Sequence, residues 1–216
     1  MNLREFIRGV SALVFGAMLY LLTSQVPRFW EYWNEKKPLR AAGGLYFPIC
    51  KQIGVPAFAQ SDPRWGTDRL AATDRSLAAE GCAVTSAAMA LAFYGMDVDP
   101  QRLNNFLNAN GGYTERGWIE WQIAAEFEPG KVRHAYEALP SYRLIDWNLI
   151  RGNPVIIRIR RAGGGTHFVL LVGKEGFEYL AQDPGAGGRL IGLSQLHSPI
   201  EALRYYERLR GKQKVG

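Results

Sequence analysis

The sequence predicts an α+β domain behind a hydrophobic N-terminal segment. Segments with helix signals come first, between about residues 82 and 152, and segments with strand patterns follow from residue 153 onwards. Helices followed by strands along one chain are typical of an α+β domain with an antiparallel sheet. The length of 216 residues fits one domain of ordinary size plus an appendage.

Residues 9–26 form an uncharged, largely apolar run that follows two arginines. As a helix, this run reaches roughly 27 Å, close to the thickness of a hydrocarbon core. Trp30, Tyr32 and Trp33 follow at the place where aromatic residues gather at a membrane interface. We therefore expect an uncleaved signal anchor with one transmembrane helix. A cleaved signal peptide and a buried core helix are the alternatives.

The anchor hypothesis divides the chain into five parts. We expect an N-terminal tail (1–8), the transmembrane signal anchor (9–26), a juxtamembrane linker (27–50), the folded domain (51–209) and a basic tail (210–216). Basic residues flank the anchor on both sides, so the positive-inside rule does not decide its orientation. A short tail before a large domain is the usual layout of a signal anchor. We therefore expect a single-pass membrane protein whose domain lies on the extracytoplasmic side.

Four helices are predicted in the first half of the domain. Residues 82–94 are rich in alanine and other helix formers, and Gly95 ends the run. Asp99 is placed to cap a second helix whose first position is Pro100, and Gly111 ends that helix. A third helix and a short fourth helix are expected at residues 116–127 and 146–152.

Strand patterns begin at residue 153. In NPVIIRIR, Ile157 and Ile159 alternate with Arg158 and Arg160, which is typical of a half-exposed strand. The segment THFVLLVG is apolar on both faces, as a central strand is, and KEG predicts a turn into the returning strand FEYLAQDP. Further strands are expected at GRLIGL and ALRYYERL.

The composition excludes several classes of function. With 47% hydrophobic and 21% charged residues, the chain can build a core. The net charge of +6 is scattered except at the C-terminal tail, and no nucleic-acid-binding module accompanies it, so we expect no nucleic-acid partner. Two cysteines, three histidines and no C-x-x-C spacing do not provide a recognisable zinc site. We expect neither a metal nor an organic cofactor.

The predicted hairpin THFVLLVGKEGFEYLAQDP brings a histidine and an aspartate together. If it closes symmetrically about Glu175, His167 and Asp183 are opposite each other, with Cβ atoms about 4.5–5.5 Å apart. A carboxylate beside an imidazole fixes the tautomer and stabilises the imidazolium, as in the orienting half of a nucleophilic triad. An ordinary strand-end histidine and a turn-forming Asp-Pro pair are the alternative.

Cys82 follows Gly81 at the point where the first predicted helix begins. The N-terminus of a helix carries partial positive charge, which stabilises a thiolate, and a neighbouring histidine adds to this effect. A core cysteine that acts as a small apolar residue is the alternative. A nucleophile also needs oxyanion donors. The backbone N–H of Cys82 is one candidate, and of the side-chain amides we choose Gln60, with Gln122 and Asn104 left open.

The sequence also resembles a known peptidase family. Five blocks carry the resemblance, in this order: VPAFAQSDPRWG, GCAVTSAAMALAFYGMDVDPQRLNNFLNANGGY, GNPVIIRI, THFVLLVG and AQDPG. They resemble blocks of the papain-like cysteine peptidases that are related to the bacteriocin-processing (double-glycine leader) peptidases. This group is cysteine-peptidase family thirty-nine with its stand-alone relatives. The resemblance spans about residues 55–185. Its most specific part is the Gly-Cys-x-x-Thr-Ser-x-x-Met block, whose Gly-Cys-Ala-Val form looks more like the secreted or membrane-tethered relatives.

The resemblance implies a papain-like cysteine peptidase fold and a set of site residues. In it, Cys82 corresponds to the nucleophile, and His167 corresponds to the general base and acid. Asp183 corresponds to the residue that orients the histidine, and Gln60 to the glutamine of the oxyanion hole.

These inferences lead to the hypothesis of a membrane-anchored cysteine peptidase that hydrolyses a peptide or protein substrate through an acyl-enzyme. An amidase or acyl transferase that acts on cell-wall peptides with the same triad is one alternative, and a non-enzymatic peptide-binding module is the other. A disulfide between Cys50 and Cys82 would block the nucleophile. An enzyme therefore requires that Cys50 is unpaired or that it pairs only for regulation.

Overall fold

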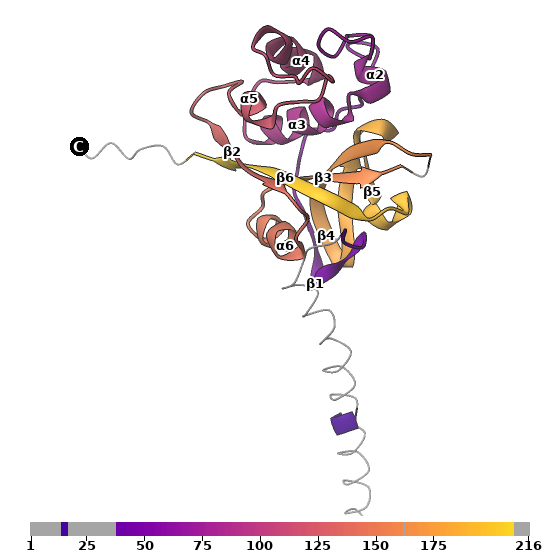
Figure 1. Cartoon of the computed structure of the whole chain (residues 1–216). Helices are drawn as coiled ribbons and strands as arrows, with labels where there is room; N and C mark the ends of the chain where they lie inside the picture. The colour runs from indigo at the N-terminus through magenta and orange to yellow at the C-terminus, as the bar shows by residue number, and fades with distance from the viewer. Residues whose placement is uncertain (1–13, 17–37, 162, 210–216) are drawn as a thin grey trace, which may run out of the picture.

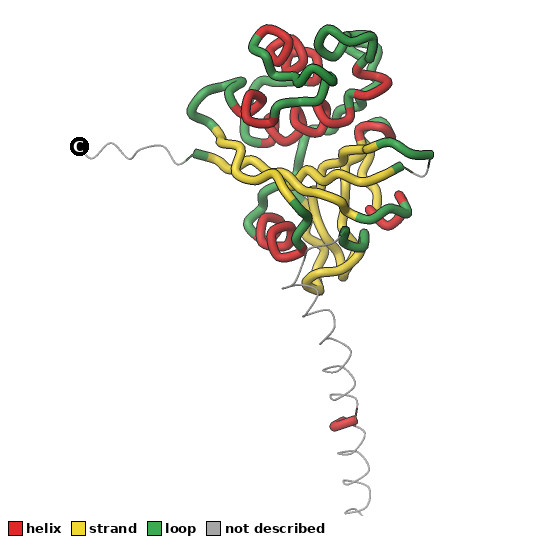
Figure 2. The backbone as a smooth tube through the Cα atoms, viewed as in Figure 1, coloured by secondary structure: helices red, strands yellow, loops and turns green. Residues whose placement is uncertain are grey.

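The computed structural model describes residues 14–16, 38–161 and 163–209. Four helices, α2 to α5, form a layer on one side of a β-sheet, and α6 packs on the other side (Figures 1 and 2). The helices are α2 (Leu77–Glu80), α3 (Cys82–Phe93), α4 (Pro100–Ala109), α5 (Trp121–Ala125) and α6 (Tyr142–Ile150). This architecture confirms the α+β class.

The strands of the sheet lie in the order β1-β4-β3-β6-β2, with β5 paired to β4, and every pairing is antiparallel. The strands are β1 (Ala42–Gln52), β2 (Val132–Ala138), β3 (Val155–Arg160), β4 (Thr166–Asp183), β5 (Arg189–Gly192) and β6 (Ile200–Arg208). The first three residues of β3 are buried, because α3 and α6 cover the two faces of the sheet at this strand. The half-exposed pattern, which was predicted for the end of this segment, is found there at Arg158 and Arg160.

The helix signals in the sequence differ in how well they locate the helices. Asp99 caps α4 by accepting a hydrogen bond from the backbone N–H of Arg102. Ser141 caps α6, which begins several residues before its predicted start. The predicted helix 116–127 is shortened to α5, because Gly117 adopts a left-handed φ of 72° and interrupts the helical path.

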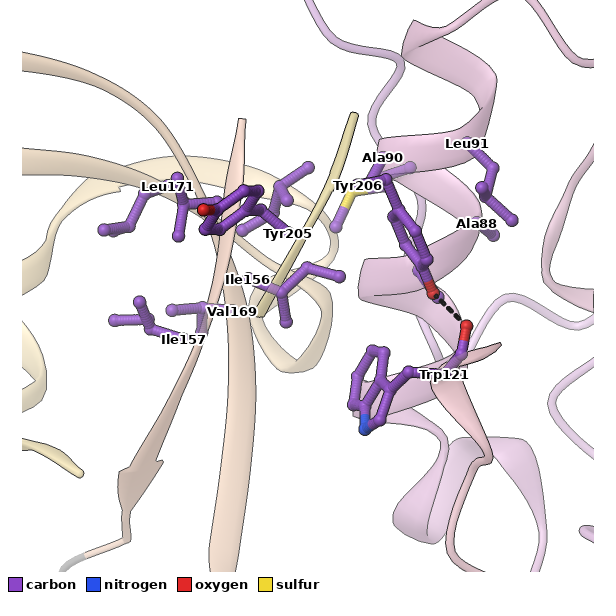
Figure 3. Packing of buried hydrophobic residues seen from close by; sticks show 14 of the residues in the cluster. Ala88, Ala90, Leu91, Trp121, Ile156, Ile157, Val169, Leu171, Tyr205 and Tyr206 are labelled. Carbon is purple, nitrogen blue, oxygen red and sulfur yellow. Dashed lines mark hydrogen bonds between the residues drawn. The ribbon is translucent and has the colours of Figure 1, made fainter. Parts of the chain in front are cut away.

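Small side chains bring α3 close to the sheet. Nine of its 12 residues are buried. Figure 3 shows Ala90 of α3 near Tyr206 of β6, whose hydroxyl donates to the backbone carbonyl of Trp121 at 3.3 Å. Alanine side chains add little volume, so the helix backbone can approach its neighbours closely. The start of α3 is therefore anchored against the sheet by a well-packed core.

Strand β1 lies within the segment that was expected to be a linker, residues 27–50. It pairs with β4 from Ala42 opposite Glu178 to Gln52 opposite Gly173, with two register shifts. The glycines and the proline in AGGLYFPICKQ are depleted in strands and hide the strand pattern in the sequence. The chain thus joins the sheet at residue 42, before the predicted domain start at residue 51.

The other predicted N-terminal parts and the basic tail lie outside the described residues, apart from residues 14–16, which are helical. Within the described ranges, no helix has both the length and the apolar character that crossing a membrane requires.

A buried ion pair fastens β1 to α6 and β4. Lys174 and Asp146 are fully buried, and Lys174 Nζ donates to Asp146 Oδ1 at 2.6 Å and to the carbonyl of Gly43 at 2.7 Å. Asp146 also accepts from the backbone N–H of Leu45 and from the hydroxyl of Tyr179. Burial raises the pKa of Asp146 and lowers that of Lys174, and each group's charge opposes the shift of the other.

Candidate active site

Cys82 is the first residue of α3, directly after Gly81. A Cβ atom on Gly81 would lie 2.5 Å from the carbonyl oxygen of Leu77, so the tight passage from α2 into α3 requires glycine here. The Cys82 side chain is buried, whereas Cys50 is exposed, and both are free thiols. No disulfide blocks Cys82.

Strand β4 brings His167 to Asp183. The His167 Nε2 and Asp183 Oδ1 atoms are 2.6 Å apart, and the two residues are only 3% and 5% exposed. Sixteen residue steps along a straight strand span roughly 50 Å, so this contact requires β4 to fold back on itself. Gly176, with a φ of 57°, lies near the midpoint of β4, next to the predicted turn.

Asp183 is held in place from its other side. It caps the 3₁₀ helix η1 (Pro184–Ala186), and its Oδ1 accepts the backbone N–H of Gly185 at 2.8 Å. Burial acts to raise the pKa of Asp183, but the hydrogen bond and charge of His167, together with the backbone donors, lower this pKa below its ordinary value. The carboxyl group is therefore ionised at neutral pH.

His167 is a base whose protonated form is stabilised. Burial acts to lower the pKa of His167, but the hydrogen bond to Asp183 and the interaction with the Cys82 side chain oppose it and raise the pKa to about 9. The Cys82 side chain is one of the groups that raise this pKa. The structure thus brings together the cysteine, the histidine and the aspartate that the sequence singled out.

The second ring nitrogen of His167 faces an arginine. Nη2 of Arg161 lies 3.0 Å from His167 Nδ1. A guanidinium group only donates, so this bond requires Nδ1 as an acceptor and the ring proton on Nε2, where Asp183 receives it. Protonation of Nδ1 breaks the bond to Arg161. The contact with Arg161 therefore belongs to the neutral form of His167, which predominates only above the raised pKa of about 9.

Gln60 lies between the start of α3 and the segment that holds Asp183. Its backbone N–H donates to the carbonyl of Pro184 at 3.1 Å, and its Nε2 donates to the carbonyl of Ala78 at 2.8 Å. Ala78 is four residues before Cys82. The Gln60 side chain is buried, and within the described part of the chain its Oε1 has no hydrogen-bond partner.

The two other amides that the sequence left open are engaged on α4 and α5. Asn104 donates to the carbonyl of Arg69 and accepts from the hydroxyl of Tyr113. Gln122 is exposed and pairs with a glutamate one turn later. Of the three amides, Gln60 is the one that contacts the turn preceding Cys82.

A cavity of about 580 Å³ opens beside Cys82, between the helical layer and the sheet. Aromatic side chains form part of its lining: Trp118, Trp121 and Phe168. The lining also contains Arg161 of the loop before His167 and three arginines that sequence reasoning did not single out: Arg75, Arg158 and Arg204. The alternation in NPVIIRIR was a signal for Arg158, but its pattern alone does not distinguish solvent from a cavity. His167, Asp183 and Gln60 do not line the cavity, so Cys82 is the member of the set that reaches it.

The raised pKa of His167 predicts a pH-dependent contribution to stability. The protonated form is favoured by the fold, so the contribution is fully present below the unfolded pKa of about 6.5 and is lost as the pH rises through about 9. We compare the free energy of unfolding of the wild type with that of His167→Gln. The margin between them is expected to be larger at about pH 6 than above about pH 9.5, by on the order of 3 kcal/mol. Urea unfolding at several pH values measures this margin.

The same comparison in a Cys82→Ala background is the control. If the interaction with Cys82 contributes to the raised pKa of His167, the change in the margin with pH becomes smaller there. A margin between wild type and His167→Gln that stays constant across this pH range would contradict the assignment of a stabilised imidazolium.

The family model described as the Peptidase_C39 like family matches residues 52–209. The chain belongs to this family. Membership confirms the resemblance that the motif blocks indicated, and it points to a peptidase, a hydrolase of the cysteine type by family. The matched range covers every element from α2 to β6, together with Gln60.

Two solved structures are similar to this Peptidase_C39 like chain. A C39-like peptidase from Bacillus anthracis is 21% identical with a TM-score of 0.47, and the match covers 74% of this chain and 99% of that chain. A double glycine motif protease from an AMS/PCAT transporter, in complex with the leader peptide, is 17% identical with a TM-score of 0.45, covering 75% of this chain and 99% of that chain. No curated protein matches the chain.

Proposed function

We propose that this chain is a cysteine peptidase that hydrolyses peptide bonds through Cys82, His167 and Asp183. The observation that carries the proposal is the buried pair of His167 and Asp183, 2.6 Å apart, beside a free cysteine at the start of α3. Membership in the Peptidase_C39 like family and the cavity beside Cys82 support it.

The first step forms the acyl-enzyme. The Cys82 thiol gives its proton to His167 Nδ1, because the raised pKa of about 9 favours the imidazolium, and the resulting thiolate attacks the carbonyl carbon of the scissile bond. Arg161 leaves Nδ1 before this transfer, because the nitrogen cannot accept from the guanidinium and carry the proton as well. Asp183 accepts the N–H of Nε2 throughout and stabilises the imidazolium. The Cys82 backbone N–H donates to the oxyanion, and the Gln60 amide donates the N–H that its bond to Ala78 leaves free.

The second half of the reaction restores the enzyme. The imidazolium of His167 gives its proton to the leaving amine as the C–N bond breaks, which leaves a thioester on Cys82. Water then attacks the thioester carbonyl, and its proton goes to Nδ1. The C–S bond breaks, the carboxylic acid leaves and the proton returns to the sulfur. The net reaction consumes one water and changes no oxidation state.

A peptide library with product analysis tests the proposal. We expect wild-type protein to generate new amino and carboxyl termini, identified by mass spectrometry. We also expect a peptidyl chloromethyl ketone to modify Cys82 and to leave the exposed thiol of Cys50 unmodified under limiting reagent. Cleavage of cell-wall peptides at amide bonds, without cleavage of any library peptide, would replace this proposal with the amidase. Binding of peptides without any product would replace it with the binding module.

We also propose attachment to a membrane through residues 9–26, with the domain on the extracytoplasmic side. The support is the uncharged, apolar run and the aromatic residues after it. Extraction of a membrane fraction with alkaline carbonate is expected to leave the full-length chain in the pellet. Its release into the supernatant would contradict the attachment. Protease protection of intact cells and of inverted vesicles tests the side of the membrane on which the domain lies.

A further inference from the structure

Two arginines in the lining of the cavity beside Cys82 carry N–H groups without acceptors. Arg204 of β6 is 8% exposed, and Glu137 accepts from its Nε at 3.0 Å and lies 2.8 Å from its Nη2. Its Nη1 is buried and has no hydrogen-bond partner among the described residues. Nε of Arg158 on β3 is also buried without a hydrogen bond among the described residues, although Glu201 Oε2 forms an ion pair with this same atom at 3.5 Å.

The two guanidinium groups lie close enough to influence each other. Their strands are neighbours, with Ile156 of β3 opposite Arg204. Burial is the largest effect on the pKa of Arg204 and lowers it, and the positive charge of Arg158 lowers it further. A buried cationic donor that lacks an acceptor is costly, and a second cation beside it adds repulsion.

The surroundings of Arg204 favour a flat, anionic group. Trp121 and Phe168 line the same cavity, and the guanidinium carbon of Arg204 lies 5.0 Å from the centroid of each ring. Two of the glutamates in the lining, Glu80 and Glu137, already pair with arginines. The arginines of the lining (Arg75, Arg158, Arg161 and Arg204) outnumber its glutamates (Glu80, Glu120 and Glu137). The lining itself therefore carries one more positive than negative charge, with Glu201 outside it paired to Arg158, and aromatic rings form part of its walls.

We propose that this cavity binds a carboxylate group of the substrate between Arg158 and Arg204, a specificity that rests on the peptidase function proposed above. A carboxylate accepts hydrogen bonds at both oxygens, so one group can satisfy the free N–H of each arginine and relieve their repulsion. The carboxylate comes from an acidic side chain close to the scissile bond or from the C-terminus of the peptide. The cavity adjoins Cys82, so its occupant positions the bond that the thiol attacks.

Matched peptide pairs test the carboxylate and identify its source. One arm replaces glutamine by glutamate at each position around the cleavage site, and the other compares free C-termini with amidated ones. We expect one of these changes to raise kcat/KM by about 10- to 100-fold, the size of a hydrogen bond to a charged group. Arg158→Met is expected to remove at least about tenfold of this preference. Equal rates for every matched pair would overturn the proposal.

The control variant is Arg133→Met. Arg133 is an exposed arginine on β2 that pairs with Glu207 and lies outside the cavity. Arg160 is less suitable, because it shares Glu201 with Arg158. We expect Arg133→Met to keep the full preference for the carboxylate. Loss of the preference in Arg133→Met as well as in Arg158→Met would overturn the assignment to the cavity.

Arg204→Lys gives a second, independent check. Lysine retains the charge but has a single ammonium group in place of the guanidinium fork, so it cannot bond Glu137 and a substrate carboxylate with the same geometry. We expect a reduced preference together with a thermal unfolding midpoint close to that of the wild type. An unchanged preference for the carboxylate in the folded Arg204→Lys variant would show that Arg204 does not bind the carboxylate.

Binding to the Cys82→Ala variant separates this inference from the proposed function. Fluorescence anisotropy with the same labelled peptide pairs measures affinity without turnover. If the variant binds the carboxylate peptides preferentially and the wild type hydrolyses none of them, the proposed anion site is supported and the proposed peptidase function is overturned. Hydrolysis by wild type without any preference in rate or binding would keep the peptidase and overturn the anion site.

Discussion

Replacement of Cys82 by alanine is expected to lower kcat/KM for peptide hydrolysis by at least about 10,000-fold. The reason is that alanine removes the atom that forms the covalent bond to the substrate, and none of the neighbouring groups substitutes for it. His167, Asp183 and the oxyanion donors remain in the variant, so any residual rate measures what positioning and electrostatics achieve without a nucleophile. Initial rates on the peptide that wild type cleaves fastest, followed by mass spectrometry, give this ratio.

Cys50→Ala is the matched control, because Cys50 is the second cysteine of the chain and its thiol is exposed and free. We expect its kcat/KM to stay within about twofold of wild type, as for surface substitutions away from a site. A Cys82→Ala variant that retains more than about one per cent of wild-type activity would show that another group forms the acyl intermediate.

Replacement of Lys174 by methionine is expected to lower the free energy of unfolding by about 3–5 kcal/mol. The change leaves the Asp146 carboxylate fully buried without its cation, and the carbonyl of Gly43 loses its donor. Domains of this size are stable by about 5–15 kcal/mol, so this single change removes a large share of the total. Urea unfolding followed by tryptophan fluorescence measures the loss.

Two further variants show whether the loss comes from the unpaired charge. Asp146→Leu combined with Lys174→Met removes both charges, and we expect it to be more stable than Lys174→Met alone. Arg69→Met removes one partner of an exposed ion pair with Asp74 and is expected to cost less than about 1 kcal/mol. A loss of less than about 1 kcal/mol in Lys174→Met would mean that Asp146 finds water or another partner.

Two parts of the candidate site could be predicted from the sequence because their signals are local, whereas the family resemblance linked these parts to each other and to Gln60. Cys82 stands directly after a glycine at a helix start, and that position depends on a few neighbouring residues. His167 and Asp183 are related by a single fold-back of one segment, whose midpoint is marked by KEG. Such relations act over fewer than about twenty residues, the range in which periodicity and turn residues are informative.

The cavity and β1 could not be predicted in this way because they depend on distant segments. Arg158 and Arg204 reach the cavity beside Cys82 only after β3 and β6 pair, and the sequence of neither strand alone indicates this pairing. Strand β1 is held by Lys174 and Asp146, more than ninety positions further along the chain. A strand that contains glycine and proline has no signal of its own without these partners.

The burial of the proposed catalytic groups limits the shape of what they can act on. Cys82, His167 and Asp183 are each at most 6% exposed, and only Cys82 reaches the cavity. A rigid, folded protein surface is too wide to bring a peptide bond to such a recessed sulfur. A single extended strand of polypeptide, in which successive side chains point to opposite sides, is narrow enough. For the peptidase proposed above, we therefore expect unfolded segments, tails and short peptides to be cleaved in preference to folded protein surfaces.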